Sequence, residues 1–345
     1  MAAKWLFWFN ELGSGDINLV GKKCANLGEM TKARVSVPPG FALSLEAYQR
    51  YMRDAGLTVE ISEFLQRFGE QGPRTYGEFA EASGFIRALM ETKPMPADMA
   101  AEIRQNYRSL CALCGQDDVA VAVRSSGPVS MPGAFETYLN VRGEEDVIAH
   151  IIKVWASTFT VQAIGHRVNN NHPLLIPGIG VAVLKMVRAK TAGVAFTMHP
   201  TTMDSTKVVI EGTWGLGESV VGGGVSPDRI IVDKLTGEAE KHINPKLKQV
   251  VYKDKGTHTV DVPEDRQNAL CLNDDEIKRL VDLALQVEKY YGVPQDIEWV
   301  FDDNQGACSL YLVQTRNISV IKSRKKEAEQ IADMMLRRVF RSGVG

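Results

Sequence analysis

An arginine at the end of a short apolar strand, followed by a turn of small residues, is the part of this sequence best suited to chemistry. Val121 and Val123 alternate as in a buried strand, Arg124 follows them, and the next residues read SSGPVSMPG. Arginine binds phosphate through two parallel N–H groups, and glycine lets backbone N–H groups approach an anion. The stretch 121–140 therefore predicts a phosphate-binding site. Taken alone, an arginine in this position is more often part of a surface ion pair.

Two widespread nucleotide-binding motifs do not fit the chain. Gly15 to Lys23 superficially matches a P-loop, but five residues rather than four separate its glycines, and Lys23 stands where Ser or Thr should follow Lys22. No GxGxxG run occurs, so a dinucleotide site of the Rossmann type is unsupported. Phosphate binding must therefore use another architecture.

Three further segments, far apart in the chain, point to one family. They are LVGKKCANLGEMTKARVSVPPGF at 19–41, EGTWGLGESVVGGGVSPD at 211–228, and DIEW at 296–299 with QTR at 314–316. Together with 121–140 they resemble, in order and spacing across nearly the whole chain, the N-terminal ATP-binding domain of the phosphoenolpyruvate synthase and pyruvate phosphate dikinase family. The SMPG turn at 130–133 and Asn317 after QTR are closer to the dikinase version.

Alternation of helical and β-rich segments argues for an α/β or α+β protein. Helices are expected over residues 21–33, 45–54, 101–113, 144–169 and 277–291, the last one behind a capping box of Asn273 and Glu276. Strands or β-rich segments are expected over 119–124, 179–187, 193–198, 208–211, 230–233, 297–301 and 309–314.

The resemblance narrows this expectation to an α+β protein with the ATP-grasp fold, in which two lobes enclose the nucleotide. Residues 1–190 are expected to form the N-terminal lobe, with a helical insertion near 60–99, and residues 191–320 the C-terminal lobe. Residues 321–345 are expected to be a basic helical tail or linker.

The family also implies which residues hold ATP and Mg²⁺. Lys23, Arg124 and Arg316 take the places of the catalytic cations on the phosphates. Glu298 and Gln314 alternate with apolar neighbours on two strands and are the expected magnesium ligands. The remaining nucleotide-binding positions are Gly133 and Thr137 in the loop that resembles the phosphate cover, Lys185, and Glu211.

Each of these residues also has a purely structural interpretation. Lys23 could be a solvated helix residue, with Lys22 as the working lysine instead, and Glu298 could simply pair with Arg316 across adjacent strands. The run 215–224 could be only a flexible hairpin. The sequence also departs from the family at Leu184, where relatives commonly have Gln, which leaves the contacts to the base open.

The six histidines of the sequence can be compared with the phosphorylatable histidine of the family. Family members pass the phosphoryl group through a histidine in a T-x-H-A-type motif on a separate swivelling domain. None of the six histidines lies in such a motif (His150, His166, His172, His199, His242 and His258). His199 is the only modest candidate for a role near the substrate. The expected partner is therefore a subunit that carries the phosphorylatable histidine and the acceptor site.

In arrangement and length the chain resembles the ATP-binding subunit of phenylphosphate synthase, which implies phenol or a similar acceptor. The alternatives are a subunit or fragment of a pyruvate, water dikinase, a rifampin-type phosphotransferase, or a regulatory module that binds ATP without turnover.

Bulk composition excludes several other classes. Forty basic and forty-two acidic residues give a net charge of −2, which does not favour nucleic acid or an anionic membrane. The sequence predicts no apolar run of membrane-spanning length, and we therefore expect a cytoplasmic protein. The five cysteines include a CxxC at Cys111 and Cys114, but no second pair completes a zinc site.

Overall fold

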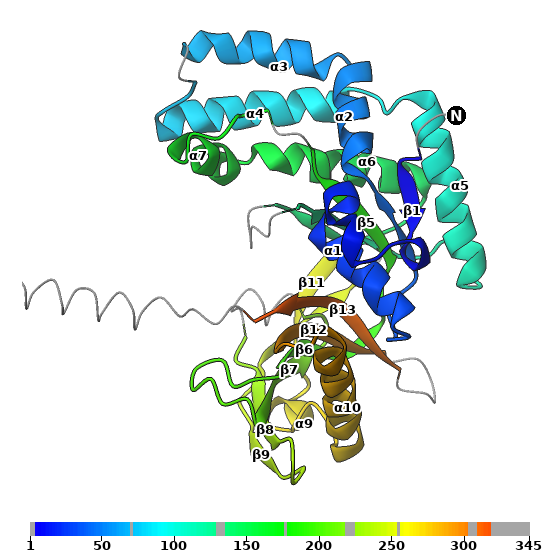
Figure 1. Ribbon diagram of the computed structural model, residues 1–345, viewed down its shortest axis with the longest axis vertical. Coiled ribbons are helices and arrows are strands. Elements are labelled where there is room, and N and C mark those ends of the chain that lie inside the picture. Colours follow the sequence, from blue (N-terminus) through cyan, green and yellow to red (C-terminus); the bar gives the residue numbers. More distant parts are fainter. Residues whose placement is uncertain are drawn as a thin grey trace, which may run out of the picture.

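Two antiparallel β-sheets, one above the other in Figure 1, form the framework of the protein. The computed structural model describes residues 4–69, 72–128, 135–175, 178–217, 225–253, 256–302 and 309–318. The first sheet has the order β1-β2-β5-β3-β4 and the second the order β13-β12-β6-β7-β8-β9, while β10 and β11 form a separate hairpin. Antiparallel sheets with helices gathered beside them define an α+β protein, as expected.

The strands have the following bounds. The first sheet consists of β1 (Leu6–Trp8), β2 (Gly40–Leu43), β3 (Val121–Ser126), β4 (Thr137–Val141) and β5 (Gly180–Lys185). The second consists of β6 (Ala189–Phe196), β7 (Lys207–Trp214), β8 (Asp228–Asp233), β9 (Ala239–His242), β12 (Gln295–Asp302) and β13 (Leu310–Asn317). The hairpin is β10 (Lys248–Tyr252) and β11 (Thr257–Asp261).

Most helices cover the first sheet on the side away from the second (Figure 1). These are α2 (Leu45–Asp54), α3 (Leu57–Leu65), α4 (Tyr76–Thr92), α5 (Ala97–Leu113), α6 (Glu144–Ala156) and α7 (Val161–Asn169). The second sheet carries α10 (Asp274–Tyr291) and the short α9 (Glu264–Gln267), and α1 (Ile17–Lys32) lies between the two sheets.

Alternation along β3 explains why Arg124 faces the second sheet. Val121 and Val123 point into the core formed with the helices, whereas Ala122 belongs to the core on the other face of the sheet. Successive side chains in a strand point to opposite faces, so Arg124 shares the face of Ala122. Ala182 and Leu184 of β5 lie on the same face. Small side chains there leave room for a ligand.

A kink at Gly21 brings the working part of α1 against the end of β3. Gly21 has φ 80°, and a Cβ atom there would lie 1.9 Å from the carbonyl oxygen of Ser126, so only glycine fits. The N–H of Lys22 donates to the carbonyl of Gly127 over 2.9 Å. The N–H of Cys24 donates to the hydroxyl of Ser126 over 3.0 Å. These contacts fix Lys23 beside Arg124.

The second sheet is stabilised by α10, which begins at the expected capping box. Asn273 accepts from the N–H of Glu276, and the Glu276 carboxylate accepts from the N–H of Asn273. Leu280 and Ala284 of this helix pack in the core that contains Trp299 of β12. Because odd-numbered residues of β12 face α10, its even-numbered residues face the first sheet.

The expected long helix at 144–169 is interrupted. Its two parts, α6 and α7, are joined by a 3₁₀ turn at Ser157–Phe159, and Thr160 caps the second part by accepting from the N–H of Ala163. Glu144–Asn169 is nevertheless long and apolar enough to cross a membrane, contrary to the sequence expectation, but 67% of its most apolar window is buried inside the protein. Burial of this kind is typical of a core helix.

Other differences from the expected elements are local. The buried strand β2 (Gly40–Leu43) and the hairpin β10–β11 were not among the strands expected from the sequence. Gly133, most of the run 215–224 and the tail 321–345 lie outside the described residues.

Candidate nucleotide site

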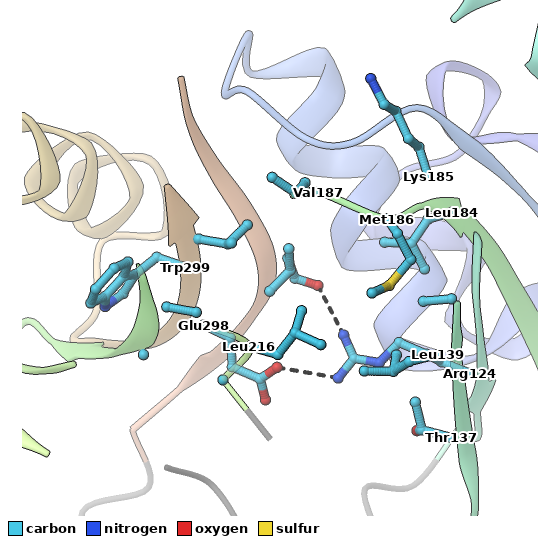
Figure 2. A pocket seen from close by; sticks show the side chains of 16 residues that line it. Arg124, Thr137, Leu139, Leu184, Lys185, Met186, Val187, Leu216, Glu298 and Trp299 are labelled. Atoms are coloured by element: carbon cyan, nitrogen blue, oxygen red, sulfur yellow. Dashed lines mark hydrogen bonds and ion pairs between the residues drawn. The ribbon is translucent and has the colours of Figure 1, made fainter. Parts of the chain in front are cut away.

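A cavity of about 370 Å³ lies between the two sheets. Its walls come from β3, β4 and β5 on one side and from β6, β12 and β13 on the other, and the segment joining β5 to β6 closes it (Figure 2). Apolar side chains dominate one part, as suits a flat base, and charged groups gather in another. The apolar lining includes Ala122, Leu139, Leu184, Met186, Val187 and Leu216.

Arg124 reaches from the first sheet to the second across this cavity (Figure 2). Its Nη2 atom lies 3.2 Å from Glu298 Oε2 and 3.3 Å from Gln314 Oε1. Its Nη1 donates to the carbonyl of Val313 over 3.4 Å. The Nε of Arg124 is buried and has no hydrogen-bond partner within the described part of the chain. A buried donor without a partner, in a side chain that lines a cavity, suits an anionic ligand.

Lys23 joins this cluster from the kinked helix. Burial is the main cause that lowers the pKa of its ammonium group to about 8, and nearby Arg124 lowers it further, while Glu298 opposes the shift. Lys23 makes no hydrogen bond or ion pair with any residue that the structure describes. Because the ammonium group of Lys23 lies among the charges of this cluster, the structure favours Lys23 as the lysine of the site.

The pairing across β12 and β13 corrects one alternative from the sequence. Cross-strand partners are Asp296 with Arg316 and Glu298 with Gln314. Arg316 Nε donates to Asp296 Oδ2 over 2.6 Å, so Glu298 is not the partner of Arg316. Burial raises the pKa of the Asp296 carboxyl, and Arg316 opposes that rise. Arg316 is thus held at the edge of the cluster by a carboxylate that the sequence had not singled out.

The other predicted residues are spread more widely. Thr137 and Lys185 line the cavity. Glu211 lies in the same cross-strand row as Glu298, through Val194, but it contacts Arg229 at 4.0 Å and does not line the cavity. His199 accepts from the backbone N–H groups of Thr201 and Thr202, each over 3.2 Å, which fits a turn-stabilising role. Gly133 lies outside the described residues.

Sequence reasoning missed Asp296 and the apolar wall. Asp296 stands two residues before Glu298 in DIEW, and this spacing puts both carboxylates on one face of a strand, which is a signal the sequence does contain. Met186, Val187 and Leu216 carry no comparable signal, because they line the cavity only through the way the two sheets are placed.

The residues present fit a magnesium ion bound together with a polyphosphate. Glu298 Oε2 and Gln314 Oε1 both converge on the same Arg124 nitrogen, so two oxygen ligands already point to one place. Among the described residues, no group of three or more His, Cys, Asp and Glu side chains could hold a metal by itself. Mg²⁺ commonly takes one or two protein oxygens and completes its shell with phosphate and water.

The lowered pKa of Lys23 predicts a pH dependence for nucleotide binding. Only the protonated lysine attracts phosphate, and with a pKa of about 8 its protonated fraction declines as pH rises through that value. Affinity for ATP in the presence of Mg²⁺ should therefore weaken about fourfold between pH 7 and pH 8.5, measured by calorimetry. Lys23→Arg, which stays charged, should bind with little change over this range. An equally steep profile in that variant would contradict the assignment.

With this geometry in place, comparison with known proteins identifies the class of site. The family described as "Pyruvate phosphate dikinase, AMP/ATP-binding domain" matches residues 17–337. A "Probable phosphoenolpyruvate synthase" of Methanocaldococcus jannaschii is 37% identical over 350 residues, covering 99% of this chain and 29% of that protein. The "Phosphoenolpyruvate synthase" of Pyrococcus furiosus is 34% identical, covering 96% of this chain and 46% of that protein. The "Phosphoenolpyruvate synthase" of Aeropyrum pernix is 36% identical, covering 95% of this chain and 44% of that protein.

The protein, whose two sheets enclose this cavity, is thus an AMP/ATP-binding domain. The chain belongs to the AMP/ATP-binding domain family of the pyruvate phosphate dikinases and phosphoenolpyruvate synthases, a family of ATP-dependent phosphotransferases. It spans less than half the length of each of these three relatives.

Proposed function

We propose that this chain binds Mg²⁺ and ATP in the cavity between its sheets and transfers the pyrophosphoryl group of ATP to a histidine on a partner subunit. The observation that carries the proposal is the convergence of Arg124, Glu298 and Gln314 at 3.2–3.3 Å, with Lys23 beside them. These groups come from α1, β3, β12 and β13, and their charges and oxygen ligands match those a metal-bound triphosphate needs.

The proposed step forms one bond and breaks one. A nitrogen of the partner's imidazole attacks the β-phosphorus of ATP, the bond from that phosphorus to the oxygen bridging it to the α-phosphate breaks, and AMP leaves. Hydrolysis of the pyrophosphorylated histidine by water then releases phosphate and leaves phosphohistidine. In this step Lys23 and Arg124 neutralise the transferring group, and Arg316 supports them from the edge. Magnesium held by Glu298 and Gln314 would offset the negative charge that develops between the phosphates.

The cavity walls suit the remaining parts of ATP. Leu184, Met186 and Val187 offer an apolar surface for the adenine ring, and Lys185 lies at its edge (Figure 2). Thr137 on β4 is placed to contact phosphate oxygens. Glu211 lies outside the cavity, on the same face of the sheet as Glu298, and we assign it a supporting role at the phosphate end.

For the acceptor we propose phenol or a similar hydroxyl compound, with this chain acting as the ATP-binding subunit of a split dikinase resembling phenylphosphate synthase. The support is that no histidine of residues 1–345 lies in a T-x-H-A-type motif, so in this proposal a group outside these residues supplies the histidine. A second candidate is the ATP-binding part of a pyruvate, water dikinase, because the curated relatives are phosphoenolpyruvate synthases. In both cases we propose that the protein acts in the cytoplasm.

The test uses ATP labelled at the β-phosphate, mixed with this chain, Mg²⁺ and the candidate histidine-bearing subunit. Acid-labile label on that subunit, together with one AMP for each label transferred, is the expected result. Phenol, pyruvate and rifampin are then added in separate reactions, and the one that discharges the label identifies the acceptor.

Two controls make this experiment decisive. The partner with its histidine replaced by alanine should stay unlabelled while ATP still binds. Tight ATP binding without AMP formation in the complete mixture would contradict the transfer step and support a module that only binds the nucleotide.

A further inference from the structure

The β10–β11 hairpin connects the two lobes at a point remote from the charged cluster. Although it lies between β9 and β12 of the second sheet in sequence, the hairpin is hydrogen-bonded to Asn140, which lies in β4 of the first sheet. Asn140 Nδ2 donates to the carbonyls of Lys253 and Gly256 over 2.5 and 3.1 Å. Those carbonyls flank the turn of the hairpin, so one side chain holds its tip.

An irregularity in β4 orients the side chain of Asn140 for this contact. Val121 pairs with Val141 and Val123 with Tyr138, so Leu139 and Asn140 together face a single residue of β3. This is a β-bulge, which redirects a side chain out of the normal alternation. Asn140 also has φ 55°, a left-handed conformation that asparagine adopts more readily than most residues.

The amide of Asn140 is fully used and its orientation is fixed. Carbonyl oxygens can only accept, so the Nδ2 group must face the hairpin. The Oδ1 atom accepts from Arg142 Nε over 3.2 Å. Asn140 is only 2% exposed, and a buried amide that satisfies its partners on both sides resists rearrangement.

Through the middle of β10 the hairpin also holds the second wall of the cavity. Leu216 donates its N–H to the carbonyl of Val250 in β10 over 2.8 Å, and Gly215 forms a parallel bridge with the same residue. A Cβ atom at Gly215 would lie 2.4 Å from that carbonyl, so the approach needs glycine. Leu216 and Gly217 line the cavity, as does Leu139, the neighbour of Asn140.

We infer that Asn140 is a positioning residue for nucleotide binding, which acts through the β10–β11 hairpin to set the distance between the Leu139 wall and the Leu216–Gly217 wall. The inference rests on the proposed binding of ATP in this cavity. Asn140 itself contacts no nucleotide. Its effect is to keep the two walls at a fixed separation, so that the protein does not have to order them when the ligand binds.

Two substitutions separate the side chain from the backbone conformation. Asn140→Gly keeps the left-handed backbone without strain and removes both hydrogen bonds to the hairpin. Asn140→Asp keeps the size but places a carboxylate against two carbonyl oxygens. Asn171→Gly is the matched control, since Asn171 also has positive φ, 53°, but is exposed and distant from the hairpin in the chain.

The first measurement is amide hydrogen exchange in the nucleotide-free protein. In Asn140→Gly, residues 214–217 and 248–253 are expected to exchange at least threefold faster, while α10 keeps its protection and shows that the fold is intact. Asn171→Gly should match the unaltered protein. Unchanged exchange at 214–217 in both Asn140 variants would overturn the inference, whatever the fate of the proposed function.

The second measurement is affinity for a non-hydrolysable ATP analogue with Mg²⁺. Both Asn140 variants are expected to bind it at least threefold more weakly. Faster exchange of the hairpin with unchanged affinity would show that Asn140 only stabilises the hairpin and would also overturn the inference. Failure of the unaltered protein to bind the analogue would refute the proposed function instead. The exchange result would still show whether Asn140 stabilises residues 214–217 through the hairpin.

Discussion

Arg124→Ala is expected to slow pyrophosphoryl transfer from ATP by tenfold or more, about 1.4 kcal/mol of activation free energy. Arg124 of the first sheet donates to both Glu298 and Gln314, it lines the cavity, and its buried Nε has no hydrogen-bond partner in the described structure. Its removal leaves the transferring phosphate without a preorganised donor pair. The measurement is the initial rate of AMP formation with the histidine-bearing subunit present.

The controls distinguish charge from shape. Arg124→Lys keeps the charge but loses the planar pair of N–H donors, so it should recover only part of the rate. Arg108→Ala removes an exposed arginine that pairs with Glu144 on the helical side and should leave the rate unchanged. A rate in Arg124→Ala equal to that of Arg108→Ala would refute the assignment.

The same variant tests the metal ligands without any turnover. The guanidinium of Arg124 occupies the place toward which Glu298 and Gln314 point, and a second cation there would be repelled. Arg124→Ala should therefore bind Mn²⁺ without nucleotide more tightly than the unaltered protein, as seen by electron paramagnetic resonance. The double variant Arg124→Ala with Glu298→Gln should lose this gain. Equal Mn²⁺ binding in the double variant would place the metal elsewhere.

Local patterns in the sequence predicted much of the framework. Strand alternation around Val121 and Val123 predicted a buried strand ending near Arg124, and the Asn273 capping box predicted the start of α10. These features depend on residues close together in the chain, so local physical rules are enough to find them. The joint family resemblance then brought together Arg124, Glu298 and Gln314, which are nearly two hundred residues apart at the extremes.

The sequence could not give register or the packing of one lobe on the other. Glu298, Gln314 and Arg316 were all identified, but which of them pair depends on the alignment of β12 with β13, including the irregularity between Glu298 and Trp299. A shift of two residues would have paired Glu298 with Arg316 instead. The contact between Asn140 and the hairpin could not be predicted from local patterns either. It depends on a bulge and on residues more than one hundred positions away.

Lys246→Met is expected to lower the free energy of unfolding of the second lobe by about 3–5 kcal/mol. Lys246 and Asp228 form an ion pair in which both side chains are completely buried. Asp228 Oδ1 also accepts from the N–H of Asn244 over 3.0 Å, and Oδ2 accepts from the N–H of Cys271 over 2.8 Å. Methionine fills similar space but leaves the Asp228 carboxylate buried without its cation, and this uncompensated charge is the source of the cost.

The ion pair affects the nucleotide site because Asp228 belongs to the sheet that carries Glu298 and Gln314. It is the first residue of β8, four positions after the glycine-rich run, and it joins the start of β8 to the segment before β10 and to the segment before α10. Loss of the pair should therefore loosen the sheet that carries Glu298 and Gln314. Unfolding by urea followed by amide hydrogen exchange of β7 and β12, both in the second sheet, reports on this lobe.

A double variant decides whether the cost comes from the unpaired charge. Asp228→Asn with Lys246→Met removes both charges, so it should be less destabilised than the sum of the two single variants. Lys248→Met, which breaks the exposed pair with Asp261, should change the stability by less than about 1 kcal/mol. If Lys246→Met were no more destabilising than Lys248→Met, water or a local rearrangement would have to solvate Asp228.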